Sequence, residues 1–257
     1  MTASESIVSV SGLCKRFGKI EALVDLDLDI PKASRFGLLG PNGAGKTTAI
    51  RILSGLLRPT RGNATVCGFD IHSQRTEIKR VTGYLPESPG LYSKLSAVEF
   101  LEFIGALYDM ERNVLMKRID RFLSILGLEG RQDDQLESYS AGMKQKVLVA
   151  STLLHEPRLV FLDEPTSHLD PAASSLVKEI IRALSEETKT TFFMCTHLTD
   201  LAEDLCDIIG ILSNGQLLTI GPPEDMINKT GARNLEEAYL KLVGDKIPRE
   251  DLLDWRL

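Results

Sequence analysis

The chain has 257 residues, of which 30 are basic and 36 acidic, and its formal net charge is −6. Proteins that bind nucleic acid usually carry a basic surface, so this balance disfavours that class. Hydrophobic residues make up 43% and charged residues 26%, which excludes a disordered chain and allows a sizeable core. No apolar run approaches the roughly 18 residues of a membrane helix, and we expect no secretory signal. Any action at a membrane is therefore expected to need a partner.

The four cysteines are spread along the chain, and no two of them form a CxxC pair. Closely spaced pairs are typical of structural zinc sites, and an even set in a short secreted chain is typical of a disulfide framework. Neither pattern is present. The sequence therefore favours free thiols and a cytoplasmic protein.

The first third of the chain is expected to contain strands of two kinds and one helix. Apolar and acidic residues alternate strictly over 24–30, which is the period of a half-buried strand. Residues 35–39 are short and mostly apolar, as in a buried strand. In chain order we predict strands over 7–10, 24–30 and 35–39, a turn at 17–19, a helix over 46–57 before Pro59, and a turn at 61–63.

The middle of the chain, about residues 88–154, is expected to be helical. Ser96 and Glu99 form a capping-box pattern that opens one helix. A second helix over 113–126 precedes Gly127, and a third begins at Ala141. The apolar face expected for the first helix consists of Val98, Leu101, Ile104, Leu107 and Tyr108.

Strands and helices alternate again in the last part of the chain. The Asn214–Gly215 pair between two apolar runs is a strong hairpin signal. We predict strands over 159–162, 190–195, 208–212 and 216–220, a helix from the Asp170 cap to about 184, and a short helix near 234–242. The whole pattern predicts an α/β core that is interrupted by a helical insertion.

A phosphate loop follows the strand at 35–39 and opens the next helix. The segment fits the pattern GxxxxGK[ST] and consists of Gly40, Pro41, Asn42, Gly43, Ala44, Gly45, Lys46 and Thr47, followed by Thr48. In such a loop backbone N–H groups and the helix N-terminus hold phosphate, the lysine reaches the β- and γ-phosphates, and the hydroxyl of Thr47 binds Mg²⁺. The sequence therefore predicts binding of a nucleoside triphosphate with Mg²⁺.

Further polar groups are expected at the ends of the later strands. Asp163 and Glu164 follow an apolar strand, where Asp163 suits the Mg²⁺ shell and Glu164 suits a general base. Ser140 caps a helix start that is open to an anion, and His197 ends the strand at 190–195. Taken alone, an acidic pair is more often a cap or a solvated turn, and a lone histidine more often has no catalytic role. The phosphate loop upstream favours the functional interpretation.

In this order the motifs resemble the nucleotide-binding subunit of ABC transporters, to about residue 222. The matching elements are Phe17, the phosphate loop, 83–87, the signature 139–143, the strand before Asp163, the loop 167–170 with His168 and Asp170, and His197. The resemblance implies an α/β P-loop NTPase core with a RecA-like mixed sheet, an N-terminal antiparallel β part and an inserted α-helical subdomain. It also implies an ATPase domain over 1–222 (core 1–87 and 155–222, insertion about 88–154) and a C-terminal helical tail over 223–257.

The resemblance also implies roles for single residues. Phe17 would stack on adenine, Glu87 would touch Mg²⁺ or water, and Asp163 would bind Mg²⁺. Glu164 would be the general base, and His197 would contact the γ-phosphate. Ser140 and Gly142 would hold the γ-phosphate bound by a second copy in a head-to-tail dimer, which Asp170 would help to hold together.

The chain departs from the usual family pattern at a few positions. Tyr139, Ala141 and Met143 replace residues of the usual LSGGQ signature, and Glu87 replaces the usual glutamine. Segments 91–108 and 235–240 resemble the subgroup that serves exporters of drugs, antibiotics, polysaccharides or ions.

The leading hypothesis is an ATPase that drives export through a separate membrane permease and lies on the inner face of the cell membrane. The permease is expected to bind at 88–92, through exposed Leu91 and Tyr92. One alternative is a soluble ABC-type ATPase acting on ribosomes or DNA, which the single phosphate loop and the acidic balance disfavour. Another is a nucleotide-binding regulator without hydrolysis, which Glu164 disfavours.

Overall fold

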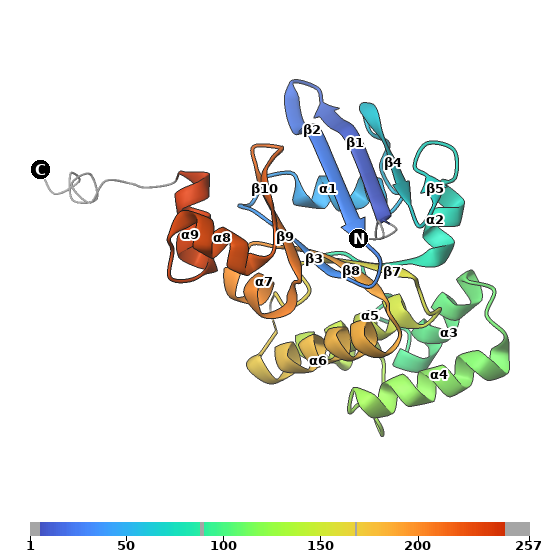
Figure 1. Cartoon of the computed structure of the whole chain (residues 1–257). Coiled ribbons are helices and arrows are strands. Elements are labelled where there is room, and N and C mark those ends of the chain that lie inside the picture. Colours follow the sequence, from blue (N-terminus) through green and yellow to red (C-terminus); the bar gives the residue numbers. More distant parts are fainter. Residues whose placement is uncertain (1–5, 88–89, 168, 245–257) are drawn as a thin grey trace, which may run out of the picture.

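The computed structural model describes residues 6–87, 90–167 and 169–244 and contains two β-sheets with helices around them (Figure 1). His168, Ser88, Pro89 and the tail from residue 245 onward, all named above, lie outside the described residues. The predicted α/β architecture with an N-terminal antiparallel part is confirmed. All four cysteines lie in the described part and are free thiols.

The N-terminal sheet is antiparallel, with the strand order β2-β1-β4-β5. Its strands are β1 (Ser6–Phe17), β2 (Ile20–Pro31), β4 (Arg61–Val66) and β5 (Phe69–Asp70). The predicted turn at 61–63 is wrong, because these residues begin β4. Their pairing with β1 shifts register between Ser11 and Cys14, so the glycine at position 62 lies at an irregularity inside a strand instead of between two strands.

The central sheet has six strands in the order β10-β9-β3-β8-β7-β6. They are β3 (Arg35–Leu39), β6 (Thr82–Leu85), β7 (Leu159–Asp163), β8 (Thr191–Thr196), β9 (Ile208–Ser213) and β10 (Gln216–Gly221). All the pairs among β3, β6, β7, β8 and β9 are parallel, while β10 returns antiparallel through the predicted Asn214–Gly215 hairpin. The carboxyl ends of five strands therefore meet at one edge, where α/β proteins bind ligands.

Side chains of the central sheet alternate between two hydrophobic cores. Phe161 and Phe193 pack toward α1 and the antiparallel sheet, whereas Leu162 and Phe192 pack toward the helices on the other face. In Figure 1 helices α3 to α6 lie on that second side. The helices are α1 (Lys46–Leu53), α2 (Arg75–Val81), α3 (Ala97–Leu107), α4 (Arg112–Ile125), α5 (Ala141–Leu153), α6 (Pro171–Glu187), α7 (Thr199–Leu205), α8 (Pro223–Thr230) and α9 (Leu235–Val243).

Helix α1 ends four residues before the predicted end at 57. Gly55 has φ of 74°, and its N–H bonds to the carbonyl of Ile52 while the N–H of Leu56 bonds to the carbonyl of Arg51. These two bonds form a Schellman motif, which ends a helix at a glycine in the left-handed region. The helix therefore stops at Gly55 before Pro59 can act.

The capping box at the start of α3 is confirmed, but part of its predicted apolar face is wrong. Ser96 accepts from the N–H of Glu99 at 3.2 Å, and Glu99 accepts from the N–H of Ser96 at 2.7 Å. Leu107 is 64% exposed, whereas Phe100 is buried. A methyl group at Gly105 would lie 2.3 Å from the Leu115 side chain, so α4 approaches α3 closely along the Gly105 face. That contact orients Leu107 toward solvent.

Replacing Gly83 by Ala tests how tightly β6 packs on α5. A methyl group there would lie 2.2 Å from the backbone carbonyl oxygen of Thr152, so α5 or β6 must shift. Overpacking of this kind typically costs about 1–3 kcal/mol. We expect Gly83→Ala to lower the urea midpoint of unfolding, while Gly221→Ala, which meets nothing within 4 Å, leaves it unchanged. Equal midpoints for the two variants would contradict this packing.

Candidate functional site

The phosphate loop joins β3 to α1 and is held by its own lysine. Lys46 Nζ lies 2.6 Å from the carbonyl oxygen of Gly40 and 3.1 Å from that of Pro41, and the side chain is buried. Gly45 has φ of 109°, and a methyl group there would lie 2.3 Å from the Ala22 carbonyl oxygen. Only glycine fits this approach, because a side chain would collide with backbone. The ammonium group of Lys46 is thus kept at the loop and is available to phosphate.

A cavity of about 360 Å³ lies against this loop. Its volume suits a bound small molecule or part of one. It is lined by Ala22, Asn42, Gly43, Ala44, Gly45, Lys46, Thr47, Thr48, Glu87, Asp163 and Glu164. The structure therefore brings the phosphate loop together with all three predicted carboxylates.

Glu164 is a buried carboxylate held from three sides. Its Oε1 lies 2.8 Å from His197 Nδ1 and 4.0 Å from Lys46 Nζ, and its Oε2 accepts a hydrogen bond of 3.1 Å from the Thr196 hydroxyl. Its side chain is 5% exposed, and its φ is 51°, in the left-handed region. Such a backbone conformation persists only where the surroundings over-determine it, and it is common at functional sites. Glu164 is therefore positioned rigidly beside the phosphate loop.

Asp163 is a buried carboxylate without a well-formed hydrogen bond to either oxygen within the described residues. Burial raises its pKa, and the negative charges of Glu87 and Glu164 raise it further; the Thr47 hydroxyl and Lys46 partly oppose this. A carboxylate in this condition gains most from a nearby cation.

The donors at this end of the cavity suit Mg²⁺. The hydroxyl of Thr47 and the carboxylates of Asp163 and Glu87 are hard oxygen ligands. The described part of the chain contains no cluster of three or more His, Cys, Asp or Glu that could hold a metal ion by itself. Mg²⁺ is usually bound by one or two carboxylates together with substrate phosphates.

The other predicted site residues do not line this cavity. Phe17 is 47% exposed at the end of β1, with Lys15 Nζ 4.9 Å from its ring centre. Ser140 accepts from the N–H of Met143 at the start of α5, and a methyl group at Gly142 would lie 3.6 Å from Asp170 Oδ2. The structure therefore places Ser140, Gly142 and Asp170 together, outside the lining of the phosphate-loop cavity of the same chain.

The predicted docking residues differ in exposure. Tyr92 is 59% exposed and meets Phe103 edge-on, with ring centres 5.3 Å apart. Leu91 is only half-buried and packs against the helical core, so the expectation of an exposed Leu91 is wrong. The apolar side chain of Leu91 packs on the helices, while the side chain of Tyr92 stays exposed to solvent.

The role of Thr196 was missed in the sequence. Its hydroxyl donates to Glu164 and accepts from the N–H of Leu198 at 3.0 Å. A threonine directly before His197 was the available signal, but its meaning depends on the pairing of β7 with β8.

Among the described helices, none has the length and apolar character needed to cross a bilayer.

The family model described as ABC transporter matches residues 23–167. A linearmycin resistance ATP-binding protein of Bacillus subtilis, LnrL, is 35% identical over 225 residues, which cover 88% of this chain and 72% of the relative. An ABC transporter ATP-binding protein of Synechocystis is 43% identical over 205 residues, which cover 79% of this chain but only 57% of that relative's length. A solved structure of the ATP binding subunit of an ABC transporter matches with a TM-score of 0.85 and 30% identity, covering 92% of this chain and 99% of the other. The chain therefore belongs to the ABC transporter family and is one of its ATP-binding proteins.

Proposed function

We propose that this chain hydrolyses ATP and drives export of a substrate through a separate membrane permease, lying at the cytoplasmic face of that membrane. The observation that carries the hydrolytic part is the position of Glu164, which is buried, bonded to His197 and 4.0 Å from the lysine of a phosphate loop. The similarity to a resistance protein supports the export direction.

In this proposal the loop residues bind the phosphates of ATP. Lys46 exchanges its bonds to two loop carbonyl oxygens for bonds to phosphate oxygens, which are charge-assisted and stronger. The N-terminus of α1 adds a favourable field for the anion. Phe17 would stack on the base, and its place at the exposed end of β1 leaves it free to do so.

Glu164 is proposed to accept the proton of the attacking water. Each of its oxygens has one hydrogen-bond partner, His197 or Thr196, and keeps a lone pair that can accept a hydrogen bond from the water. His197 stays partly exposed beside it, and its ring would contact the γ-phosphate. A base that is held in place avoids the cost of ordering it during the reaction.

Thr47, Asp163 and Glu87 are the residues proposed to hold Mg²⁺. The ion would neutralise negative charge on the phosphates. The buried oxygens of Asp163, which have no well-formed hydrogen bond among the described residues, support this assignment.

We further propose that the complete site needs two copies of the chain. Ser140 and Gly142, the expected donors to the γ-phosphate, do not line the cavity of their own chain. Ser140 is exposed and begins α5, whose N-terminus is suited to an anion. In a head-to-tail dimer this helix start would cover the phosphate bound by the partner.

The surface proposed for the permease is the aromatic pair of Tyr92 and Phe103. Both side chains are exposed, and aromatic residues are typical anchors of protein interfaces. Leu91 would support the pair from beneath, since it packs against the helical core. Tyr92 follows Glu87 closely in sequence, which connects this surface to the proposed Mg²⁺ site.

Replacing Glu164 by Gln should leave ATP bound and slow its turnover, because the base is removed while the shape is kept. The expected loss is about 10²- to 10⁴-fold. Lys46→Ala should instead weaken binding, since a hydrogen bond between charged groups is worth about 1.5–3 kcal/mol. Phosphate release and titration with a fluorescent nucleotide measure the two effects. The exposed Glu129→Gln is the control, and parental turnover in Glu164→Gln would refute the role of the base.

ATP-dependent dimerisation can be tested in the same slow variant. Glu164→Gln with ATP and Mg²⁺ should elute as a dimer in size exclusion, and adding Ser140→Arg should return it to a monomer because the arginine blocks the α5 start. Adding Ser124→Arg, at an exposed serine of α4, should have no effect. Ser140→Arg also removes a helix cap worth about 1 kcal/mol, so its unfolding midpoint is measured beside it. A monomer of Glu164→Gln at saturating ATP argues against the dimer.

The permease surface is tested by Tyr92→Ala combined with Phe103→Ala. Buried aromatic anchors often cost about 2 kcal/mol or more when truncated, so co-sedimentation with permease-containing membranes should fall while basal ATPase activity persists. Leu218→Ala with Ile220→Ala, two exposed apolar residues on β10, is the matched control. Unchanged sedimentation would place the docking surface elsewhere, and co-purification with ribosomes or DNA would overturn the transport role.

A further inference from the structure

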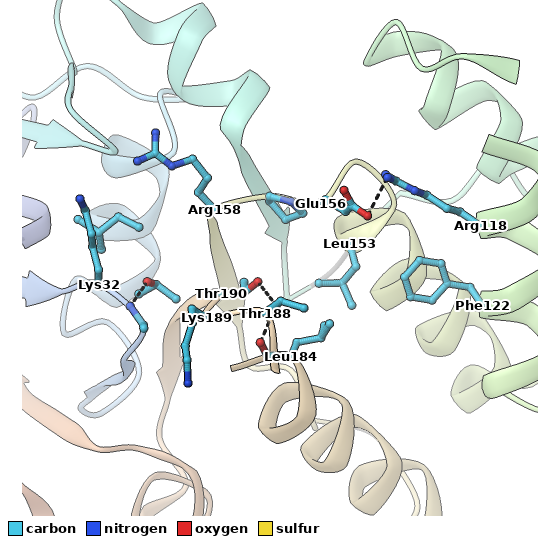
Figure 2. Close-up of a pocket in the computed structure, with 14 residues that line it drawn as sticks. Lys32, Arg118, Phe122, Leu153, Glu156, Arg158, Leu184, Thr188, Lys189 and Thr190 are labelled. Atoms are coloured by element: carbon cyan, nitrogen blue, oxygen red, sulfur yellow. Dashed lines mark hydrogen bonds and ion pairs between the residues drawn. The ribbon is translucent and has the colours of Figure 1, made fainter. Parts of the chain in front are cut away.

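A second and larger cavity lies at the opposite edge of the central sheet from the phosphate loop. Its volume is about 710 Å³, within the range of small-molecule sites. Residues from just before β3, β7 and β8 line it, together with residues of α4 and the ends of α5 and α6 (Figure 2). The proposed ATPase mechanism uses none of these side chains.

The lining of this cavity is divided into an apolar side and a cationic side. Figure 2 shows Phe122, Leu153 and Leu184 on one side, together with the ion pair of Arg118 and Glu156. Arg158 and Lys189 lie on the other side, with their charged ends pointing apart. Leu153 is buried, and Phe122 and Leu184 are half-buried, so the apolar side is a continuation of the helical core. Both cationic residues are exposed. An occupant therefore meets hydrocarbon at one end and positive charge at the other.

The positive charge of the cavity is not balanced from within. Glu156 is the single carboxylate among its described lining residues, and it is already paired with Arg118 at 2.7 Å. Arg118 also donates to the carbonyl oxygen of Leu154 at 2.9 Å. Within the part of the chain that the structure describes, neither the Arg158 nor the Lys189 side chain forms an ion pair. On a chain of net charge −6, this local excess of cations requires a separate explanation.

The helix dipoles account for only part of this excess. α5 and α6 both end at the cavity, and their last carbonyl groups carry partial negative charge that favours nearby cations. Arg118 already donates a hydrogen bond to the carbonyl oxygen of Leu154 at the C-terminal end of α5. The side chains of Arg158 and Lys189 make no hydrogen bond to either helix end in the described residues. They are therefore available to an anion from outside.

We propose that this cavity binds a small amphiphilic anion, with an apolar chain or ring and one carboxylate or phosphate head. The apolar part would lie against Phe122 and Leu153, and the head would bind Arg158, with Lys189 adding positive charge on the same side. Arginine and lysine form charge-assisted hydrogen bonds with such heads, and hydrocarbon is stabilised by leaving water. Such a ligand would bridge α4 and the central sheet. Strands β7 and β8 separate it from the ATP site by about 17 Å, so it would not compete with ATP.

The test is calorimetric titration of the full chain with four probes below their micellar concentrations. Dodecanoate and dodecyl phosphate have both chain and charged head, dodecanol has the chain alone, and acetate has the head alone. We expect the first two to bind with one molecule per chain and the last two to bind at least tenfold more weakly. Saturating ATP should leave dodecanoate affinity unchanged.

Charge reversal of the cationic side provides the decisive comparison. Arg158→Glu with Lys189→Glu should weaken dodecanoate binding at least tenfold, whereas Lys117→Glu with Arg121→Glu, exposed on α4 outside the cavity, should not. If the first variant does not fold, Arg158→Gln with Lys189→Gln should weaken binding in the same direction. Equal dodecanoate affinity in the cavity and control variants, or equal binding of dodecanol and dodecanoate, overturns the proposal.

Discussion

The parallel pairing of β7 with β8 determines the geometry on which the candidate site depends. In this register Asp163 lies beside Cys195, and the N–H of Glu164 donates to the carbonyl oxygen of Cys195 at 2.9 Å. The next residues of the two strands are Glu164 and Thr196, which therefore meet at the sheet edge and bond through their side chains. If one strand shifted by one residue relative to the other, the Glu164 and Thr196 side chains would lie on opposite faces of the sheet. Because every residue of both strands is buried, such a shift would also move the side chains of the shifted strand from one core into the other.

The same edge concentrates negative charge that the protein alone does not neutralise. Glu87, Asp163 and Glu164 line one cavity, and Lys46 is the cation that lies among them. Phosphate by itself would add to this repulsion, whereas phosphate bound together with Mg²⁺ would bring compensating positive charge. Under the proposed function the arrangement would therefore favour the metal complex of the nucleotide. Glutamate at position 87, where the family usually has glutamine, would strengthen that preference because it adds a further carboxylate.

Local signals in the sequence predicted those features that depend on neighbouring residues. The capping box at Ser96, the hairpin at Asn214–Gly215 and the phosphate loop all formed as expected, since each is stabilised within a few residues of chain. The same holds for the general order of strands and helices. The spacing of the cysteines also indicated free thiols, which is how the structure describes them.

Features that depend on distant contacts were not predicted. The strand β6 has only four residues, and it is a strand because β7 pairs with it. Its position brings Glu87 to the phosphate loop, so the sequence suggested the role of that residue only through the family resemblance. Leu107 belongs to an apolar period, yet the close contact of Gly105 with Leu115 turns it outward. The bonds from Thr196 and His197 to Glu164 likewise require a strand order that periodicity does not contain.

The unusual signature segment can be explained by its packing. Tyr139 replaces the usual leucine; it is buried, and its hydroxyl donates to the carbonyl oxygen of Arg131. The guanidinium carbon of Arg131 lies 5.7 Å from the centre of the tyrosine ring. A buried phenol needs such an acceptor, because an unpaired hydroxyl would cost about 1–3 kcal/mol. Tyr139 thus ties the preceding loop to the start of α5.

This anchoring leaves the start of α5, the proposed anion-binding end, open. Ala141 is exposed at the first position of α5, so its methyl group can replace the hydrogen of the usual glycine without displacing a neighbouring group. Gly142 keeps the close approach that a phosphate oxygen would need, with Asp170 beside it on the α6 cap. The departures from the usual pattern therefore change how the segment is held, while Ser140 and Gly142 remain able to meet a phosphate presented by a second copy.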